Sequence, residues 1–179
     1  MEEERCGFTY HAPDPYPPVQ AEERNQRYGA VMLDNMAGIS SEMSTVSRYL
    51  HAQIVTMGLP EVAEAFQSLS ITEMHHLKIF GTLSFQLGMD PRLWSMRQGR
   101  RFWWSPAYNR YPRDLEAILQ NALREEQRAI RKYESQLQWI RDGNVLENLR
   151  RIIQDERLHV ELLQTLLSSY AGIALPPHL

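Results

Sequence analysis

The chain has 179 residues, of which 43% are apolar and 23% charged, and its formal net charge is −3. This length and composition favour one domain with a sizeable core and exclude a disordered, collagen-like or disulfide-rich protein. The single cysteine, Cys6, excludes an internal disulfide, a four-cysteine zinc site and an iron–sulfur cluster held within one chain. A charge so close to zero gives no bulk attraction to nucleic acid or membranes, and neither is expected as a partner.

The sequence shows no membrane-spanning or secretory segment. It contains no run of about 18 apolar residues, so a transmembrane helix is not expected. Residues 1–5 are mostly acidic and are not followed by the apolar stretch of a signal peptide. We therefore expect a cytoplasmic protein.

Three segments can be distinguished along the chain. Residues 1–20 contain too many prolines for a helix and are predicted to form an extended arm. Residues 21–170 show helical periodicity and are predicted to form the bundle domain. Residues 171–179, with two further prolines, are predicted to be a short C-terminal tail.

The domain opens with apolar residues at steps of three and four over residues 21–57. This pattern predicts one long helix or two helices end to end. Gly29 and Gly38 are the positions where this helix is expected to kink or break. Gly58, followed by Pro60, indicates the end of one helix and the start of the next.

Three further helices are predicted over about residues 60–88, 112–142 and 143–170. The connection at residues 89–111 reads as irregular, and about twenty residues can run the length of a ~30-residue helix. The second and third helices can therefore run parallel, whereas short loops make the other neighbours antiparallel. The predicted fold class is all-α, a four-helix bundle with one long crossover between its second and third helices.

Six mid-helix residues carry the main chemical information. The second and fourth helices each contain Glu-x-x-His, and a step of three places both side chains on one helix face. The first and third helices each contain one glutamate on or beside an apolar face. The six residues are Glu42, Glu73, His76, Glu126, Glu156 and His159. Because the midpoints of bundled helices of similar length meet at one level, we predict that these side chains converge in the core.

Such a cluster is untenable without compensating charge. Several ionised carboxylates placed out of water and close together are strongly unfavourable. Two divalent cations supply four positive charges against four carboxylates, and they leave the imidazoles neutral. Glu126 is preferred over its neighbour Glu125 because it shares a face with apolar residues.

On these residues the sequence resembles the ferritin-like superfamily, and within it the rubrerythrins, bacterioferritins and manganese catalases. The resemblance covers about residues 28–170. It implies two metal ions, iron or manganese, bridged by Glu73 and Glu156. Glu42 and Glu126 would then be terminal ligands, with one histidine on each ion.

The chain departs from the family pattern in three places, and one of them is the stretch of only nine residues after Tyr170, where storage-type ferritins often add a short fifth helix. Rubrerythrins usually append a rubredoxin domain with four iron-binding cysteines, whereas Cys6 is the only cysteine here. Ala129 stands where rubrerythrins carry a further glutamate. Met74 follows the first ligand of its motif, as the haem-ligating methionine of bacterioferritins does. Such a methionine also occurs without haem, and haem is not expected.

Two tyrosines lie seven residues, nearly two turns, after a candidate ligand. Tyr49 is predicted to hydrogen-bond a ligand or to act as a redox-active phenol, and ferritin-like proteins are similar at this position. For Tyr133 the preferred interpretation is a core tyrosine whose hydroxyl is satisfied locally.

The crossover is rich in arginine and tryptophan, with six and three of them in residues 92–113. A basic and aromatic stretch can bind single-stranded nucleic acid. Packing on the bundle or on a partner subunit is the preferred interpretation, and we expect a homodimer or a larger homo-oligomer.

These observations favour a di-metal oxidoreductase that acts on hydrogen peroxide or O₂ in oxidative-stress defence. A peroxidase of this kind would need a separate electron donor. The alternatives are ferritin-type iron oxidation and storage, a coat or assembly component built on the same bundle, and a bundle that binds no metal and acts through its arm and crossover.

Overall fold

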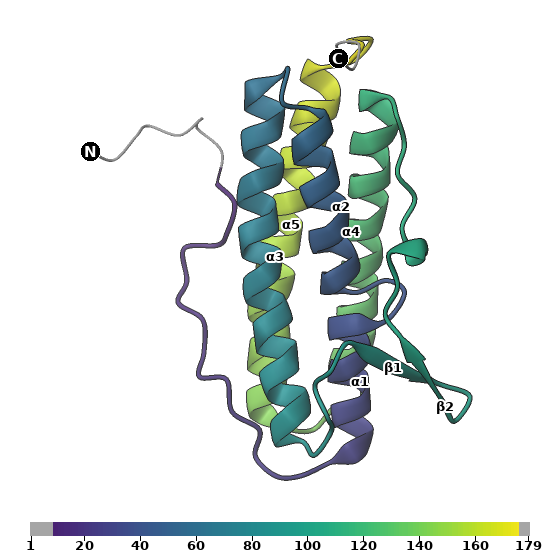
Figure 1. The fold of residues 1–179 in the computed structure, drawn as a ribbon. Helices are drawn as coiled ribbons and strands as arrows, with labels where there is room; N and C mark the ends of the chain where they lie inside the picture. Colours follow the sequence, from purple (N-terminus) through teal and green to yellow (C-terminus); the bar gives the residue numbers. More distant parts are fainter. Residues whose placement is uncertain (1–8, 176–179) are drawn as a thin grey trace.

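The computed structural model describes residues 9–175. Residues 1–8 of the predicted arm, with Cys6, and residues 176–179 of the predicted tail lie outside this range. The described residues form five α-helices, which pack as a four-helix bundle because the first two together make one long member (Figure 1). The helices are α1 (Gln26–Ala37), α2 (Glu42–Val55), α3 (Pro60–Gln86), α4 (Leu115–Leu137) and α5 (Gly143–Ser169).

The first bundle member breaks at the second of the two predicted glycines. Gly38 ends α1, and the side chain of Ser41 caps α2 by accepting a hydrogen bond from the backbone N–H of Ser44. A β-carbon on Gly38 would collide with the side chain and carbonyl of Asp34, so any other residue here would force Asp34 or the backbone to shift. The break places Glu42 in the first turn of α2, at the middle of the bundle member.

The long crossover makes α3 and α4 run parallel, as predicted, and Figure 1 shows it rising along the bundle beside α2 and α4. It is less irregular than predicted, because strands β1 (Trp94–Arg97) and β2 (Arg100–Trp103) form an antiparallel hairpin. The turn between them has positive φ at Gln98 and Gly99, the backbone pattern of a tight hairpin turn. The 3-10 turn η1 (Pro106–Tyr108) follows.

Three arginines of the crossover, Arg92, Arg97 and Arg101, stack on its own aromatic rings. Arg101 lies 4.3 Å from the ring centre of Trp94, and Arg97 lies 5.0 Å from that of Phe102. Trp94 is buried in the core, and the Trp104 indole N–H donates to the Ser44 hydroxyl at 3.0 Å. The sequence favoured a crossover that packs its aromatic residues on the bundle, and Trp94 and Trp104 do so.

The apolar core consists of two clusters. One lies around α1 and the adjoining halves of α3 and α5, and includes Phe80 and Tyr133. The other lies around α2 and includes Tyr49 and Phe66. The buried polar residues of the mid-helix motif separate the two clusters. Within residues 9–175, no helix combines the length and apolar character needed to cross a bilayer.

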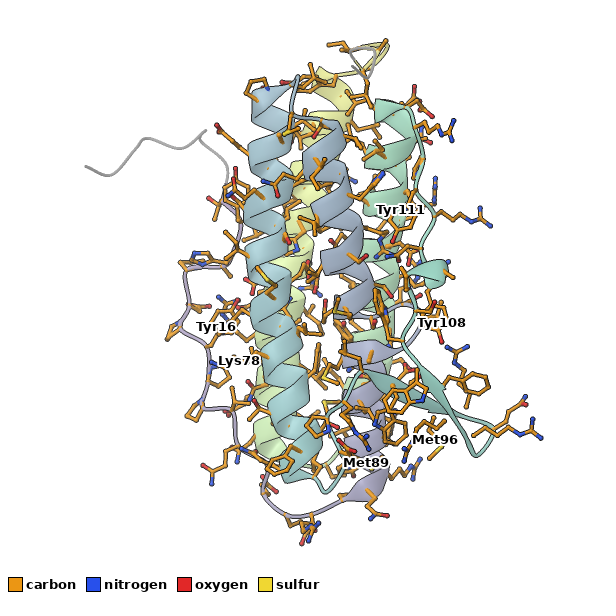
Figure 2. All side chains as sticks on the ribbon, in the orientation of Figure 1. Tyr16, Lys78, Met89, Met96, Tyr108 and Tyr111 are labelled. Carbon is orange, nitrogen blue, oxygen red and sulfur yellow. The ribbon has the colours of Figure 1, made fainter. Side chains whose placement is uncertain are left out.

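The described part of the arm, residues 9–20, lies along the bundle on the side of α3 (Figure 1). Tyr16 packs its ring edge-on to His75 of α3, with ring centres 4.3 Å apart, and Figure 2 shows Tyr16 and Lys78 on this flank. The Pro18 carbonyl accepts from the Asn148 amide at 3.1 Å. The arm therefore contacts both α3 and α5.

The role of Gly38 can be tested by the substitution Gly38→Ala. We expect it to lower the free energy of unfolding of the metal-free protein by about 1–3 kcal/mol, because Asp34 and the break must shift to make room. Urea denaturation measures the change. An unchanged midpoint would show that the break tolerates a side chain, and Gln53→Ala, at a half-buried position of α2, provides the control.

Candidate metal centre

The six predicted residues lie together at the centre of the bundle, one or two from each member. Each is at most 2% exposed. α2 supplies Glu42, α3 supplies Glu73 and His76, α4 supplies Glu126, and α5 supplies Glu156 and His159. Glu125, the neighbour that the sequence ranked below Glu126, faces outward and pairs with Arg128 at 2.9 Å.

The side chains form two clusters, each able to hold a metal ion. Within each cluster the potential ligand atoms lie within 4.8 Å of one another. One cluster is Glu42, Glu73, His76 and Glu156, and the other is Glu73, Glu126, Glu156 and His159. Glu73 and Glu156 belong to both. This geometry suits the proposed assignment of these two carboxylates as bridges, with one terminal glutamate and one histidine for each ion.

Both imidazoles direct Nδ1 to the shared carboxylates. His76 Nδ1 lies 3.2 Å from a Glu73 oxygen and 3.3 Å from a Glu156 oxygen. His159 Nδ1 lies 2.9 Å from Glu73 and 3.3 Å from Glu156. The one-turn spacing within each Glu-x-x-His pair produces this convergence, since residues i and i+3 share a helix face.

Several of these buried atoms have no hydrogen-bond partner. They are one oxygen of Glu73, both oxygens of Glu156 and His159 Nδ1, although the last lies within ion-pair distance of both carboxylates. Buried polar atoms are nearly always hydrogen-bonded, and exceptions often mark a site for an ion. The orphaned atoms all belong to the shared pair or to a candidate histidine, so the residues present fit two bound cations.

The two terminal glutamates each accept a hydrogen bond from a tyrosine of the opposite bundle member. Tyr49 of α2 donates to Glu126 of α4, as the sequence predicted for a hydroxyl bonded to a ligand. Tyr133 of α4 donates to Glu42 of α2. The local interpretation preferred for Tyr133 was therefore wrong: the same seven-residue spacing reaches across the bundle at both positions.

In the metal-free centre the pKa values of the four glutamates shift in two opposite directions. Burial, followed by repulsion from the shared carboxylates, raises the pKa of Glu42 and of Glu126 well above the usual range. Burial also opposes ionisation of Glu73, but its contacts with His159 and His76 outweigh this and hold its pKa well below the usual range. The pKa of Glu156 is lowered for the same reason.

The histidines complete this balance. Burial disfavours their charged forms, but hydrogen bonds to carboxylates outweigh it and raise the pKa of His76 well above its usual value and that of His159 to about 10. These directions favour a metal-free centre in which Glu73 and Glu156 are ionised, both histidines are protonated, and Glu42 and Glu126 keep their protons. In that state the six groups have a formal charge of zero, and two divalent ions in place of four protons would keep it at zero.

Sequence reasoning missed the residues that hold the outer nitrogens of the imidazoles. His76 Nε2 lies 2.9 Å from Asp155 Oδ2, and His159 Nε2 lies 2.9 Å from the backbone carbonyl oxygen of Tyr10 in the arm. Partners at the outer nitrogen fix the tautomer and ring orientation of a metal-binding histidine. Asp155 directly precedes Glu156, which was the available sequence signal, whereas nothing local to Tyr10 points to His159.

The arm also forms hydrogen bonds with Asp155. The backbone N–H of Ala12 donates to Asp155 Oδ1 at 2.7 Å, and the Tyr16 hydroxyl donates to Oδ2 at 2.6 Å. Arg151, one turn before Asp155, pairs with it at 2.5 Å and donates to the Ala12 carbonyl at 2.8 Å. Burial raises the pKa of Asp155, but its hydrogen bonds with His76, Arg151 and Tyr16 outweigh burial and hold this pKa well below the usual range, so Asp155 remains an acceptor.

The contribution of the arm can be tested with Tyr16→Phe, which removes one donor to Asp155. Burial raises the pKa of Tyr16 to about 12, so its hydroxyl keeps its proton over the useful pH range. We expect metal affinity to fall by roughly 10-fold, at the lower end of losses seen when such outer partners are removed. Calorimetric titration with Mn²⁺ measures this. The control is Tyr28→Phe, which removes a hydroxyl that accepts from the Arg141 backbone N–H, away from the centre. Equal metal affinities in the two variants would contradict a role of Tyr16 in metal binding.

The protonation of the centre predicts a strong pH dependence of metal binding. Groups with raised pKa hold protons that a cation must displace, so affinity rises with pH, and filling both clusters releases about four protons near pH 7. Calorimetry in two buffers of different ionisation enthalpy counts the released protons. Release close to zero would show that the ligands are already deprotonated in the metal-free protein.

Comparisons with known proteins agree with this geometry. A family model described as Rubrerythrin matches residues 36–167, a range that contains all six candidate ligands. The crystal structure of KatB, a manganese catalase from Anabaena PCC7120, has a TM-score of 0.79 at 20% sequence identity, covering 96% of this chain and 84% of that one. A structure of wild-type KatB gives 0.79 at 19% identity, covering 96% and 86%. No curated protein matches the chain.

The TM-scores establish that this chain has the same fold as KatB, a ferritin-like helical bundle. Because the sequence identity is below 25%, the structural similarity establishes the fold alone. The family match covers well over half of the chain and includes both Glu-x-x-His pairs. The chain therefore belongs to the Rubrerythrin family of ferritin-like di-metal carboxylate proteins.

Proposed function

We propose that this chain is a di-metal oxidoreductase whose substrate is hydrogen peroxide. The observation that carries the proposal is the pair of buried clusters that share Glu73 and Glu156. Two adjacent redox-active ions, when bound, would exchange the two electrons by which peroxide is reduced to water or oxidised to O₂. One imidazole per cluster among carboxylates suits iron and manganese alike.

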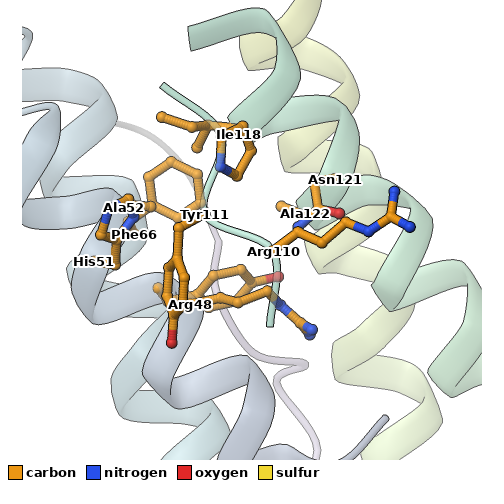
Figure 3. A pocket seen from close by; sticks show the side chains of 11 residues that line it. Arg48, His51, Ala52, Phe66, Arg110, Tyr111, Ile118, Asn121 and Ala122 are labelled. Carbon is orange, nitrogen blue, oxygen red and sulfur yellow. The ribbon is translucent and has the colours of Figure 1, made fainter. Parts of the chain in front are cut away.

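The size of a cavity that Tyr49 lines supports a small substrate. A cavity of about 10 Å³, room for about one water-sized molecule, is lined by Tyr49, Phe66 and Ala122 among others (Figure 3). Tyr49 links this cavity to the centre because its hydroxyl donates to Glu126. A space this small favours peroxide or O₂ over a bulky organic substrate.

The chain's own groups would position and buffer protons during turnover. Burial raises the pKa of the Tyr49 and Tyr133 phenols well above the usual value, so both remain hydrogen-bond donors. They orient the terminal carboxylates Glu126 and Glu42. Of the two terminal glutamates, Glu126 is the one whose tyrosine partner, Tyr49, lines the cavity. A proton released by the substrate would therefore be held at a Glu126 oxygen.

Two overall reactions are compatible with this centre. In disproportionation, two molecules of hydrogen peroxide give two of water and one of O₂, with no outside electron source. In peroxidase turnover, one peroxide, two electrons and two protons give two molecules of water. The electrons would come from a separate donor, since the single cysteine cannot form a rubredoxin centre.

The proposal is tested with protein loaded with Fe²⁺ or Mn²⁺ and assayed for peroxide consumption. An oxygen electrode detects disproportionation, whereas consumption without O₂ release, dependent on added reductant, indicates a peroxidase. We expect Glu73→Gln to retain at most about one ion per chain and to lose activity at least 100-fold, because both clusters lose a shared carboxylate. Glu64→Gln, on the exposed face of the same helix, should change neither.

Other results would contradict the proposal. Fewer than about one ion per chain in the wild type, unchanged by Glu73→Gln, would argue for a bundle that works without metal. A large assembly that retains many irons per chain would favour ferritin-type storage. Two ions per chain without peroxide turnover would leave the metal centre in place and remove peroxide as its substrate.

A further inference from the structure

A second, strongly basic site lies outside the metal centre, between α2, the end of the crossover and α4. It is a hollow of about 250 Å³ lined by Arg48, Arg110, Arg124 and Arg128, with Asn121 and Glu125. Four guanidinium groups face one carboxylate, so the lining carries a formal charge of about +3. We call this hollow the arginine pocket.

The single acid does not satisfy these arginines. Glu125 lies 2.9 Å from Arg128 and 3.7 Å from Arg48, so one carboxylate is shared by two guanidinium groups. Within residues 9–175, no carboxylate lies within ion-pair distance of Arg110 or Arg124, and both are exposed. Uncompensated guanidinium groups around one hollow repel one another, and a bound anion would relieve that repulsion.

Arg48 gives the pocket a buried and incompletely paired donor. It is 8% exposed, and its two Nη groups donate to Asn109 at 3.3 Å and to Thr45 at 2.9 Å. Its Nε–H is buried and has no partner among the described residues. A buried charged donor without an acceptor is costly, so an acceptor supplied by a ligand would stabilise it.

The arginine pocket also adjoins the small cavity beside the metal centre. Arg48, Arg110 and Asn121 line both spaces, and Figure 3 shows Arg48 and Arg110 at the small cavity with Tyr111. Tyr49 lines the small cavity and donates to Glu126. An anion in the arginine pocket would therefore lie next to the small cavity that Tyr49 lines.

We propose that the arginine pocket is a binding site for a small tetrahedral oxyanion of the phosphate type. The guanidinium groups come from three elements and approach the hollow from different sides, which suits oxygens that point in several directions. Guanidinium groups bind such oxygens through paired, charge-assisted hydrogen bonds. Binding itself does not depend on the proposed peroxide chemistry. A reduction of peroxide turnover by the bound anion would rest on that function.

The test uses the full-length, metal-free protein, because phosphate can also bind to metal ions. Calorimetric titration with inorganic phosphate, at an ionic strength held constant with NaCl, is expected to show one saturable site per chain. The double substitution Arg110→Gln and Arg124→Gln should weaken binding at least about 10-fold, because each removes a charged donor. Both residues are exposed, so the fold should survive, and circular dichroism checks this.

Controls separate a built site from general charge attraction. Arg150→Gln, on the exposed surface of α5, should leave phosphate affinity unchanged. Equal weakening by Arg150→Gln, or no saturable binding by the wild type, would overturn the proposal. Sulfate should bind comparably and acetate at least about 10-fold more weakly, and acetate binding as tightly as phosphate would overturn the preference for a tetrahedral anion.

One further titration distinguishes the sources of the phosphate group. Glycerol phosphate should bind more weakly than inorganic phosphate if the ligand is the free ion. It should bind at least as tightly if the ligand is a phosphoryl group on a larger molecule. Either result supports the arginine pocket as a phosphate site, and absence of binding by both compounds would overturn it.

Discussion

Burial of four carboxyl groups and two imidazoles at the centre of a helical bundle is the constraint around which this molecule is built. Each unpaired ion removed from water costs roughly several kcal/mol, even after the surroundings relax. The metal-free centre lowers this cost by pairing two imidazolium ions with two carboxylates and by keeping the remaining two carboxyl groups neutral. If two divalent ions took the place of these four protons, as proposed, the formal charge of the centre would stay the same, and the apolar core around it would face no added charge.

The polar centre divides the apolar core, and the two parts are joined through tyrosines. Tyr49 belongs to the cluster around α2 and Tyr133 to the cluster around α1, and each donates across the bundle to a terminal glutamate. A phenol suits this position because its ring packs with apolar neighbours while its hydroxyl reaches a buried acceptor. Each half of the core therefore helps to orient one side of the centre, which couples packing to ligand geometry.

Local periodicity was enough to predict the bundle and the six central residues. An α-helix fixes the relative directions of residues three and four apart, so Glu73 with His76, and Glu156 with His159, could be assigned to shared faces. Gly38 was one of two glycines at which the sequence allowed a break, and the sequence did not distinguish it from Gly29. The hairpin of the crossover was missed because its two strands have four residues each and depend on a tight Gln98–Gly99 turn.

Features that depend on distant segments could not be predicted in this way. The contact between Ala12 and Asp155 spans 143 residues, and that between Tyr10 and His159 spans 149. A backbone carbonyl accepts a hydrogen bond whatever its side chain, so residue type carries no information about the Tyr10 contact. The cross-bundle role of Tyr133 and the convergence of four arginines likewise depend on which helices become neighbours.

The contacts of the arm have a consequence for how the protein assembles. During synthesis the arm is made before the five helices of residues 9–175, and α5, which carries Asp155 and His159, is the last of these helices to be made. The backbone groups of Tyr10 and Ala12 therefore have no partners on α5 until nearly the whole chain exists. Their docking closes loops of more than 140 residues, and such long-range closure is favourable only once the bundle is in place. The contacts of the arm with α5 at the candidate metal centre can therefore form only late in synthesis, although its contacts with α3 can form earlier.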